Sequence, residues 1–330
     1  MLKAGVRLKV SGKFFEAQTD DGKKSFTPGT ILIPIGIQEK TQDVRALLDQ
    51  CVQEDGALVY ALKSGFSLGG VDLGSPSFET VQMPKVLLVV GPGVSATDAG
   101  EVWHLLDRRF GLELSLVEIN LLNRIDLGRY TVIAMVGGTY ASIDSSGVAS
   151  VRKWVENGGT LIAMEQAVEW AVNNRLTGAR LRRSEASRRD SLSARHAYAD
   201  EAKYTGALQV DGAILEVQCD LTHPLLYGYE EERFGVFKTN SVFLEPSRNP
   251  YATPVQYTQN PLLSWYLNKE YDRLVRNSAE VVVSGLRSGR VILMTDNPNF
   301  RAFWFGTNRL FLNAVFFGST IRASSARTQD

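Results

Sequence analysis

Glu165 and Gln166 are the residues whose position in the sequence most clearly suggests chemistry. They directly follow the apolar run at residues 160–164. Such a run, polar only at its carboxyl end, is typical of a parallel strand covered by helices on both faces. Open α/β sheets bind ligands just beyond these strand ends, and hydrolases of this build carry a Ser or Cys on the sharp turn there. The sequence therefore predicts the place of a nucleophile and puts a carboxylate in it.

Two interpretations of Glu165 follow. A carboxylate removed from water is costly unless it is paired, so we expect Glu165 to be solvated in a cleft or matched by a cation. In the first interpretation it belongs to a pocket, where it can act as a base with water as nucleophile. In the second it caps the following helix, whose positive end favours a negative charge. The sequence leaves both open.

A glycine-rich turn at residues 91–96 fits the pattern Gly-x-Gly-x-x-Ala. It follows a predicted strand and precedes a predicted helix, which is the context of a dinucleotide-binding turn. Pro92 removes one backbone N–H that a pyrophosphate would need, and Ala96 weakens the match at the third position. The alternatives are a nucleotide or small-molecule site at Gly91–Ser95 and a structural glycine turn.

Histidines and metal ligands are sparse. Glu101 and His104 lie on one helical face, but a metal site would need further ligands from elsewhere. None of His104, His196 and His223 is followed by Glu three residues later, so no His-x-x-Glu zinc motif is present. Cys51 and Cys219 are far apart and suggest neither a disulfide framework nor a thiolate site. We expect no metal and no cofactor.

The remaining candidates lie in predicted loops. His223 precedes Pro224, and a structural hydrogen bond is its simplest role. Asp296, Asn297 and Arg301 follow a predicted strand end and can line the same crevice; packing and loop hydrogen bonds explain them equally well. The complete candidate pocket comprises Gly91, Gly93, Ser95, Glu101, Gly137, Gly138, Thr139, Tyr140, Glu165, Gln166, His223 and Arg301.

Composition limits the possible partners. The 330 residues include 36 basic and 36 acidic side chains, so no overall field recruits nucleic acid or an anionic membrane. No apolar run approaches the roughly 20 residues that span a bilayer. Residues 175–195 contain seven arginines with several serines. We expect a mobile, solvated insertion there; an anion-binding lid is the alternative.

Periodicity predicts two domains and a tail. Residues 1–80 read as a small α+β unit, with strands at 6–35 and 57–62 and a helix beginning at Thr41. Residues 81–320 read as an α/β domain with a doubly wound, mostly parallel sheet, and residues 321–330 as a polar tail. The expected later elements are strands at 213–219, 236–244 and 280–295 and helices at 262–275 and 307–318.

Several blocks in the larger domain occur in an order that resembles one family. The blocks are residues 84–88, 91–95, 100–104, 137–140, 158–163, 220–225, 297–303 and 306–314. Together they resemble the C-terminal class I glutamine-amidotransferase-like domain of large proteins related to zinc carboxypeptidases. The resemblance covers roughly residues 80–320 and implies a flavodoxin-like fold.

The departures from this family shape the functional expectation. An amidotransferase needs a thiolate where this chain has Glu165, and a zinc peptidase needs the absent His-x-x-Glu pair. The resemblance therefore implies a non-catalytic accessory domain, whose partner is the peptidase domain of the same parent or a small ligand. The abrupt start of predicted structure suggests a fragment of a longer protein. The compartment stays open, and a periplasmic or secreted parent is compatible with two unpaired cysteines.

Overall fold

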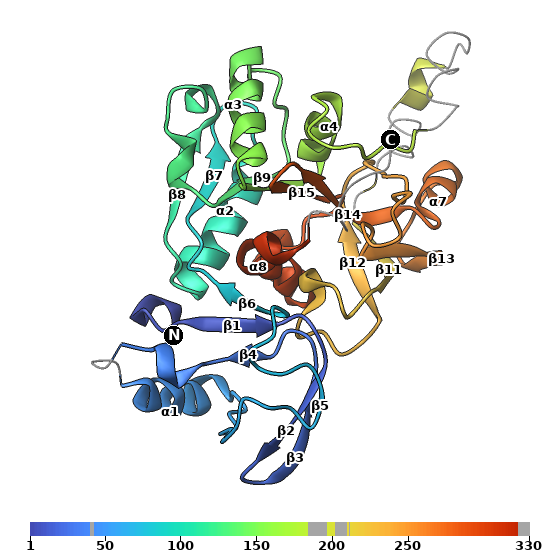
Figure 1. The fold of residues 1–330 in the computed structure, drawn as a ribbon. Coiled ribbons are helices and arrows are strands. Elements are labelled where there is room, and N and C mark those ends of the chain that lie inside the picture. Colours follow the sequence, from blue (N-terminus) through green and yellow to red (C-terminus); the bar gives the residue numbers. More distant parts are fainter. Residues whose placement is uncertain (40–42, 184–196, 202–209, 211, 323–330) are drawn as a thin grey trace. The chain divides into compact units, whose positions relative to one another are not determined.

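The structure, a computed structural model, describes residues 1–39, 43–183, 197–201, 210 and 212–322 (Figure 1). The chain divides into two compact units, Met1–Met83 and Pro84–Asp330. In the described part, no helix is both long and apolar enough to cross a membrane.

The N-terminal unit contains two small antiparallel sheets. In one, β1 (Leu8–Ser11) lies between β4 (Ile31–Leu32) and β6 (Phe78–Val81). In the other, β2 (Phe15–Thr19) lies between β3 (Gly22–Phe26) and β5 (Gly69–Gly70). Phe15, Ala17 and Phe78 form one hydrophobic cluster of this unit, and Val6, Val10 and Val81 are buried as well.

The helix cap and one strand of this unit differ from the prediction. The helix α1 (Val44–Asp55) is capped by Asp43, whose side chain accepts from the backbone N–H of Ala46 at 3.0 Å; Thr41 lies outside the described residues. The predicted strand at 57–62 is wrong, because only Leu62 pairs, through a single bridge to Thr19. Leu58 and Val59 are 84% and 45% exposed, whereas Leu62 packs against the core cluster of this unit without forming a strand.

The C-terminal unit is built on one large sheet of nine described strands, in the order β12-β11-β13-β14-β15-β10-β9-β7-β8. Its parallel part consists of β7 (Val86–Val90), β8 (Leu114–Glu118), β9 (Val132–Met135), β10 (Thr160–Met164) and β15 (Gly289–Met294). An antiparallel part continues it with β14 (Ala279–Leu286), β13 (Val255–Ser264), β11 (Ala213–Cys219) and β12 (Arg233–Lys238).

Helices cover both faces of the parallel strands. On β10, Ile162 and Met164 join one hydrophobic cluster while Leu161 and Ala163 join another, as strand alternation requires. The first cluster includes side chains of α2 (Ala96–Trp103) and α8 (Asn308–Phe317), and the second those of α3 (Ser145–Glu156) and α4 (Gln166–Asn173). A sheet with helices on both faces is doubly wound, so the predicted α/β, flavodoxin-like fold is confirmed at this level.

Two elements after residue 230 differ from the prediction. Residues 255–264 form β13, and the helix α7 (Lys269–Val275) begins only after Asn268, which caps it. Asn260 and Pro261 interrupt the alternation of β13, and its pairing with β11 shifts register; Pro in a strand is characteristic of such irregular places. The strand expected at 236–244 is observed as β12, which begins at Arg233 and ends at Lys238. Beyond its end, Asn240 donates a hydrogen bond to the carbonyl oxygen of Thr295.

The expected mobile insertion is partly ordered. Thr177 and Ser284 are joined through their hydroxyls at 2.7 Å, and Arg182 donates to the carbonyl oxygen of Arg276 at 2.7 Å. Residues 175–183 therefore pack on the sheet, and the expectation is wrong for them; residues 184–195 lie outside the described part. At the end of the chain Ile321 is buried, and its carbonyl accepts from Arg290, so the expected polar tail does not start at 321. Residues 323–330 are outside the described part as well.

Candidate functional site

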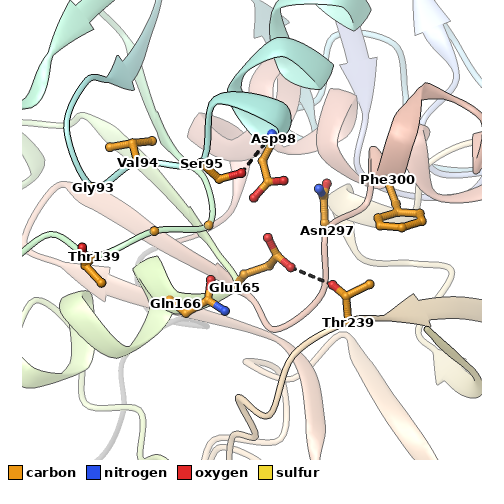
Figure 2. A pocket seen from close by; sticks show the side chains of 12 residues that line it. Gly93, Val94, Ser95, Asp98, Thr139, Glu165, Gln166, Thr239, Asn297 and Phe300 are labelled. Atoms are coloured by element: carbon orange, nitrogen blue, oxygen red, sulfur yellow. Dashed lines mark hydrogen bonds between the residues drawn. The ribbon is translucent and has the colours of Figure 1, made fainter. Parts of the chain in front are cut away.

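A pocket of about 650 Å³ lies at the carboxyl ends of the parallel strands (Figure 2). The loops that follow β7, β9, β10 and β15 meet there, joined by the loop after β12. This is where open α/β sheets bind ligands. The lining residues are Gly93, Val94, Ser95, Asp98, Gly137, Gly138, Thr139, Glu165, Gln166, Thr239, Asn297 and Phe300.

The glycine-rich turn after β7 is bonded to the loop after β9. Ser95 N–H donates to the carbonyl oxygen of Gly137 at 2.8 Å, and Thr139 N–H donates to that of Gly93 at 2.8 Å. Gly138 has φ 147°, and a Cβ there would lie 2.6 Å from the carbonyl oxygen of Gly93. The glycines thus allow the two loops to approach closely through their backbones. The N–H groups of Ser95 and Thr139 donate to these loops and are not free to bind a phosphate. This arrangement supports the structural interpretation of the turn over a nucleotide site.

Glu165 occupies the sharp turn between β10 and α4. Its φ of 51° and ψ of −123° are unusual for a residue with a side chain, and its backbone N–H donates to the carbonyl oxygen of Met294 at 2.9 Å. This turn directs the side chain away from the sheet and into the pocket (Figure 2). The Glu165 side chain makes no capping hydrogen bond to α4. The helix-capping interpretation is therefore wrong, and the pocket interpretation is the one that fits the geometry.

The carboxyl group of Glu165 is buried among polar groups, with only 6% of the residue exposed. Its Oε1 accepts from the Thr239 hydroxyl at 3.0 Å and from Asn240 Nδ2 at 3.2 Å. Burial first, and then the neighbouring carboxyl group of Asp98, raise the pKa of Glu165 to about 8. We expected solvent or a cation beside this carboxylate; instead, a proton held with Asp98 compensates its burial.

Asp98 reaches the pocket from the first turn of α2. Ser95 caps this helix by accepting from Asp98 N–H at 3.3 Å, while the Asp98 side chain turns toward Glu165 (Figure 2). A Cβ placed on Gly137 would lie 2.4 Å from Asp98 Oδ2, 2.5 Å from Glu165 Oε2 and 3.1 Å from Gln166 Oε1. Three side-chain oxygens therefore converge beside Gly137.

Gly137→Ala is expected to damage this site more than the fold. The new methyl group would push apart the two carboxyl groups, which are the ends of side chains, and the destabilisation should stay within about 1–3 kcal/mol, the range for overpacking. Gly100→Ala is the matched control, because a Cβ there meets nothing within 4 Å and α2 should gain about 1 kcal/mol. Urea unfolding measures both. If Gly137→Ala left the free energy of unfolding unchanged, the carboxyl pair would not be closely held.

Glu101 supports the pocket from behind. It is buried in α2 and accepts from Asn297 Nδ2 at 2.6 Å and from the backbone N–H of Arg301 at 2.5 Å. Burial raises its pKa. Glu101 therefore fixes Asn297 and the loop after β15 and does not itself line the pocket.

A buried ion pair anchors the other side. Lys238, at the end of β12, lies 2.9 Å from Asp296 Oδ1, and Tyr257 donates to Asp296 Oδ2 at 2.6 Å. Next to Lys238, Thr239 and Asn240 contact Glu165, and Asn240 also donates to the carbonyl oxygen of Thr295 at 2.9 Å. This pair therefore ties the loop after β12 to the end of β15.

The structure brings together seven of the predicted site residues. The residues that line the pocket are Gly93, Ser95, Gly137, Gly138, Thr139, Glu165 and Gln166. The predicted residues outside the lining are Gly91, Glu101, Tyr140, His223 and Arg301. Val94, Asp98, Thr239 and Phe300 line it without having been predicted, and Asn297 was expected only as a loop residue near the crevice. Asp98 lies in the first turn of α2, and this position was its only local signal.

His223 belongs to a different part of the unit. It begins the turn at Pro224–Leu226, where its Nδ1 accepts from Leu225 N–H at 3.3 Å. Burial lowers its pKa to about 4, so it is neutral at physiological pH. The predicted structural hydrogen bond is present, and the placement of His223 in the pocket is wrong.

The pocket contains no thiol. Cys219 is buried on β11, where burial raises its pKa to about 11, and Cys51 lies on α1 of the other unit. Within the described residues, no three His, Cys, Asp or Glu side chains are grouped to hold a metal ion. What the site offers is a proton-sharing carboxyl pair surrounded by hydroxyl and amide groups.

No family model matches the chain, and no curated protein does. Among solved structures it is similar to a ThuA-like protein of Parabacteroides merdae, with TM-score 0.46 and 13% identity, covering 76% of this chain and 93% of that one. A ThuA-like protein of Bacteroides uniformis gives TM-score 0.45 and 13% identity, covering 74% and 94%. A cytoplasmic protein of Salmonella typhimurium gives TM-score 0.42 and 12% identity, covering 70% and 97%. None of these three is described as a zinc carboxypeptidase, and similarity at this level says nothing of activity.

Proposed function

We propose that this chain is a non-catalytic accessory domain that binds a small polar ligand in the pocket at Glu165. The observation that carries the proposal is the turn after β10: it has the geometry that exposes a nucleophile, and it presents a carboxyl group instead. In the order of its sequence blocks the domain resembles the accessory domain of zinc-carboxypeptidase-like proteins. A peptidase domain of the same parent is the partner we propose from that resemblance.

The ligand-binding part of the proposal is supported by the way the pocket is held. Five loops are fixed by hydrogen bonds between them, and the buried groups of Glu101 and Lys238 hold two of those loops from behind. Binding sites of this kind are largely formed in advance, with a few polar groups that orient the ligand. Buried carboxyl groups that nothing else requires for the fold are a frequent mark of such sites.

A second candidate function is hydrolysis by the carboxyl pair itself. Two carboxyl groups that share one proton can activate water, with one acting as base and the other as acid, as in aspartic proteases. The specific observation in favour is that Asp98 Oδ2 and Glu165 Oε2 lie together beside Gly137, in surroundings that raise the pKa of Glu165 to about 8. Binding remains the first proposal, because the turn after β10 carries a carboxyl group in place of the Ser or Cys nucleophile.

The two candidates are separated by assays on the purified chain. The accessory-domain proposal expects no turnover of glutamine or of carboxypeptidase peptides, and no bound zinc after dialysis. A broad thermal-shift screen of amines, sugars, amino acids and metals should give at least one hit, since a ligand at 100 times its Kd adds about 2.7 kcal/mol. That hit should disappear in Glu165→Gln and persist in Glu156→Gln, which removes a carboxylate outside the pocket. Turnover that Glu165→Gln abolishes would favour the hydrolase, and stoichiometric zinc would contradict the accessory proposal.

A further inference from the structure

We infer that the pocket recognises a primary ammonium group, seated among the carboxyl groups of Asp98 and Glu165 and the amide oxygen of Gln166. The inference rests on the proposed function, because it assigns a ligand class to the same pocket. It concerns the chemistry of one end of the ligand, the end that enters beside Gly137.

The number and direction of acceptors carry this inference. Asp98 Oδ2, Glu165 Oε2 and Gln166 Oε1 lie 2.4, 2.5 and 3.1 Å from the position that a Cβ on Gly137 would occupy, so the three oxygens lie close to one another at this wall of the pocket. The other carboxyl oxygen of Glu165 is already occupied by Thr239 and Asn240. Acceptors that converge in this way need donors between them. An ammonium group has three N–H donors and no acceptor, so it matches three converging oxygens.

The charge of the lining points the same way. Its twelve residues include the carboxyl groups of Asp98 and Glu165 and no lysine, arginine or histidine. The buried cation Lys238, which precedes the lining residue Thr239, is already paired with Asp296 at 2.9 Å. A carboxylate or phosphate ligand would therefore meet like charge, while a cation would form charge-assisted hydrogen bonds.

A metal ion fits these ligands less well. Calcium takes six to eight oxygen ligands and usually several carboxylates. The pocket supplies two carboxyl groups and one amide, and the described residues contain no cluster of three metal-binding side chains. An ammonium group needs only the three acceptors that are present.

Binding of an ammonium group should displace a proton from the pocket. At neutral pH the free pocket holds a proton between Asp98 and Glu165, since the pKa of Glu165 is about 8. An ammonium group in that position supplies the positive charge itself, so the shared proton is released. Two further titratable groups lie near the pair. Tyr140, from the loop after β9, has a raised pKa that keeps it neutral, and Glu101, on the same helix as Asp98, has a pKa raised by burial first and also by the charge of Asp98. Ammonium binding should therefore strengthen as the pH rises toward 8, by up to about tenfold per pH unit.

The test compares probes that differ only in the ammonium group. D-glucosamine is paired with D-glucose, and 1,5-diaminopentane with 1,5-pentanediol, in NMR titrations of the whole chain at pH 6 and pH 7. We expect the ammonium member of each pair to bind roughly ten- to a hundredfold more tightly, the range for hydrogen bonds to charged groups. For the diamine, which stays charged at both pH values, we expect the affinity to rise between pH 6 and pH 7.

Variants locate the effect in the pocket. Asp98→Asn and Glu165→Gln should each weaken the diamine by about tenfold or more, while Glu156→Gln should change its Kd by less than about twofold. Equal binding of diamine and diol, both lost in Glu165→Gln, would overturn the ammonium inference and leave the pocket as a ligand site. Calcium that binds more tightly than either amine would also overturn it. If neither amine perturbs pocket residues while the broad screen has a hit that depends on Glu165, the inference fails and the proposed function stands.

Discussion

Replacing Lys238 by methionine is expected to lower the free energy of unfolding of the C-terminal unit by about 3–5 kcal/mol. Lys238 is completely buried and lies 2.9 Å from Asp296, which is itself 2% exposed. Methionine keeps most of the volume and removes the charge, so Asp296 would be left in the core without its cation. Glu280 lies close by, and burial followed by the charge of Asp296 already raises its pKa well above the ordinary value. Lys238 opposes this shift, so without it the pKa of Glu280 would rise further and Asp296 would hold an uncompensated charge.

The measurement can be confined to the correct unit. All five tryptophans, at positions 103, 154, 170, 265 and 304, belong to Pro84–Asp330, so tryptophan fluorescence in urea reports the C-terminal unit alone. Arg233→Met is the matched control on the same strand, because Arg233 makes a 3.8 Å surface pair with Glu216 that should contribute at most about 1 kcal/mol.

A second variant tests the assigned cause. Adding Asp296→Asn to Lys238→Met should restore part of the loss, because the unpaired charge is then gone. Equal effects of Lys238→Met and Arg233→Met would mean that the buried pair is not stabilising. The same fluorescence experiment with a pocket ligand would show whether loosening this anchor also weakens binding.

Replacing Glu165 by glutamine is expected to stabilise the C-terminal unit relative to the wild type by about 2–4 kcal/mol more at pH 8 than at pH 4.5. In the folded state the pKa of Glu165 is about 8, whereas an unfolded glutamate titrates near its model value of 4.5. Between these values the folded protein holds a proton that the unfolded chain has lost. The stability contributed by this group is therefore complete below about pH 4.5 and declines as pH rises to about 8.

The difference between wild type and variant isolates this group. His223 also titrates, but its pKa is lowered to about 4, so it affects stability as pH falls from about 6.5 and does so equally in both proteins. Urea unfolding at pH 4.5, 6 and 8 gives the comparison. Glu156→Gln, which removes an outlying carboxylate, should give a nearly constant difference over pH 6–8. A constant difference for Glu165→Gln would show that Glu165 is not protonated in the folded protein.

The sequence by itself determined the strands and helices whose patterns are local. The apolar run at Thr160–Met164 is β10 to the residue, and Gln166 begins α4 as expected. Ser95 caps α2 through a hydrogen bond to a residue three positions away. Such features depend on neighbouring residues, so alternation, caps and glycine turns are enough to predict them. The sequence also placed Glu165 on the turn after the central strand.

Only the tertiary structure decided what surrounds Glu165. Asp98 approaches from a helix 67 positions earlier, and Thr239 and Asn240 from a loop about 75 positions later. No local pattern relates these residues, since their proximity depends on the order of strands in the sheet. The strand β13 was hidden for a similar reason: pairing with β11 and β14 stabilises a segment that contains Asn260 and Pro261. The protonated state of Glu165 likewise follows from burial beside Asp98, because a pKa depends on the three-dimensional surroundings of the group and not on the residue type alone.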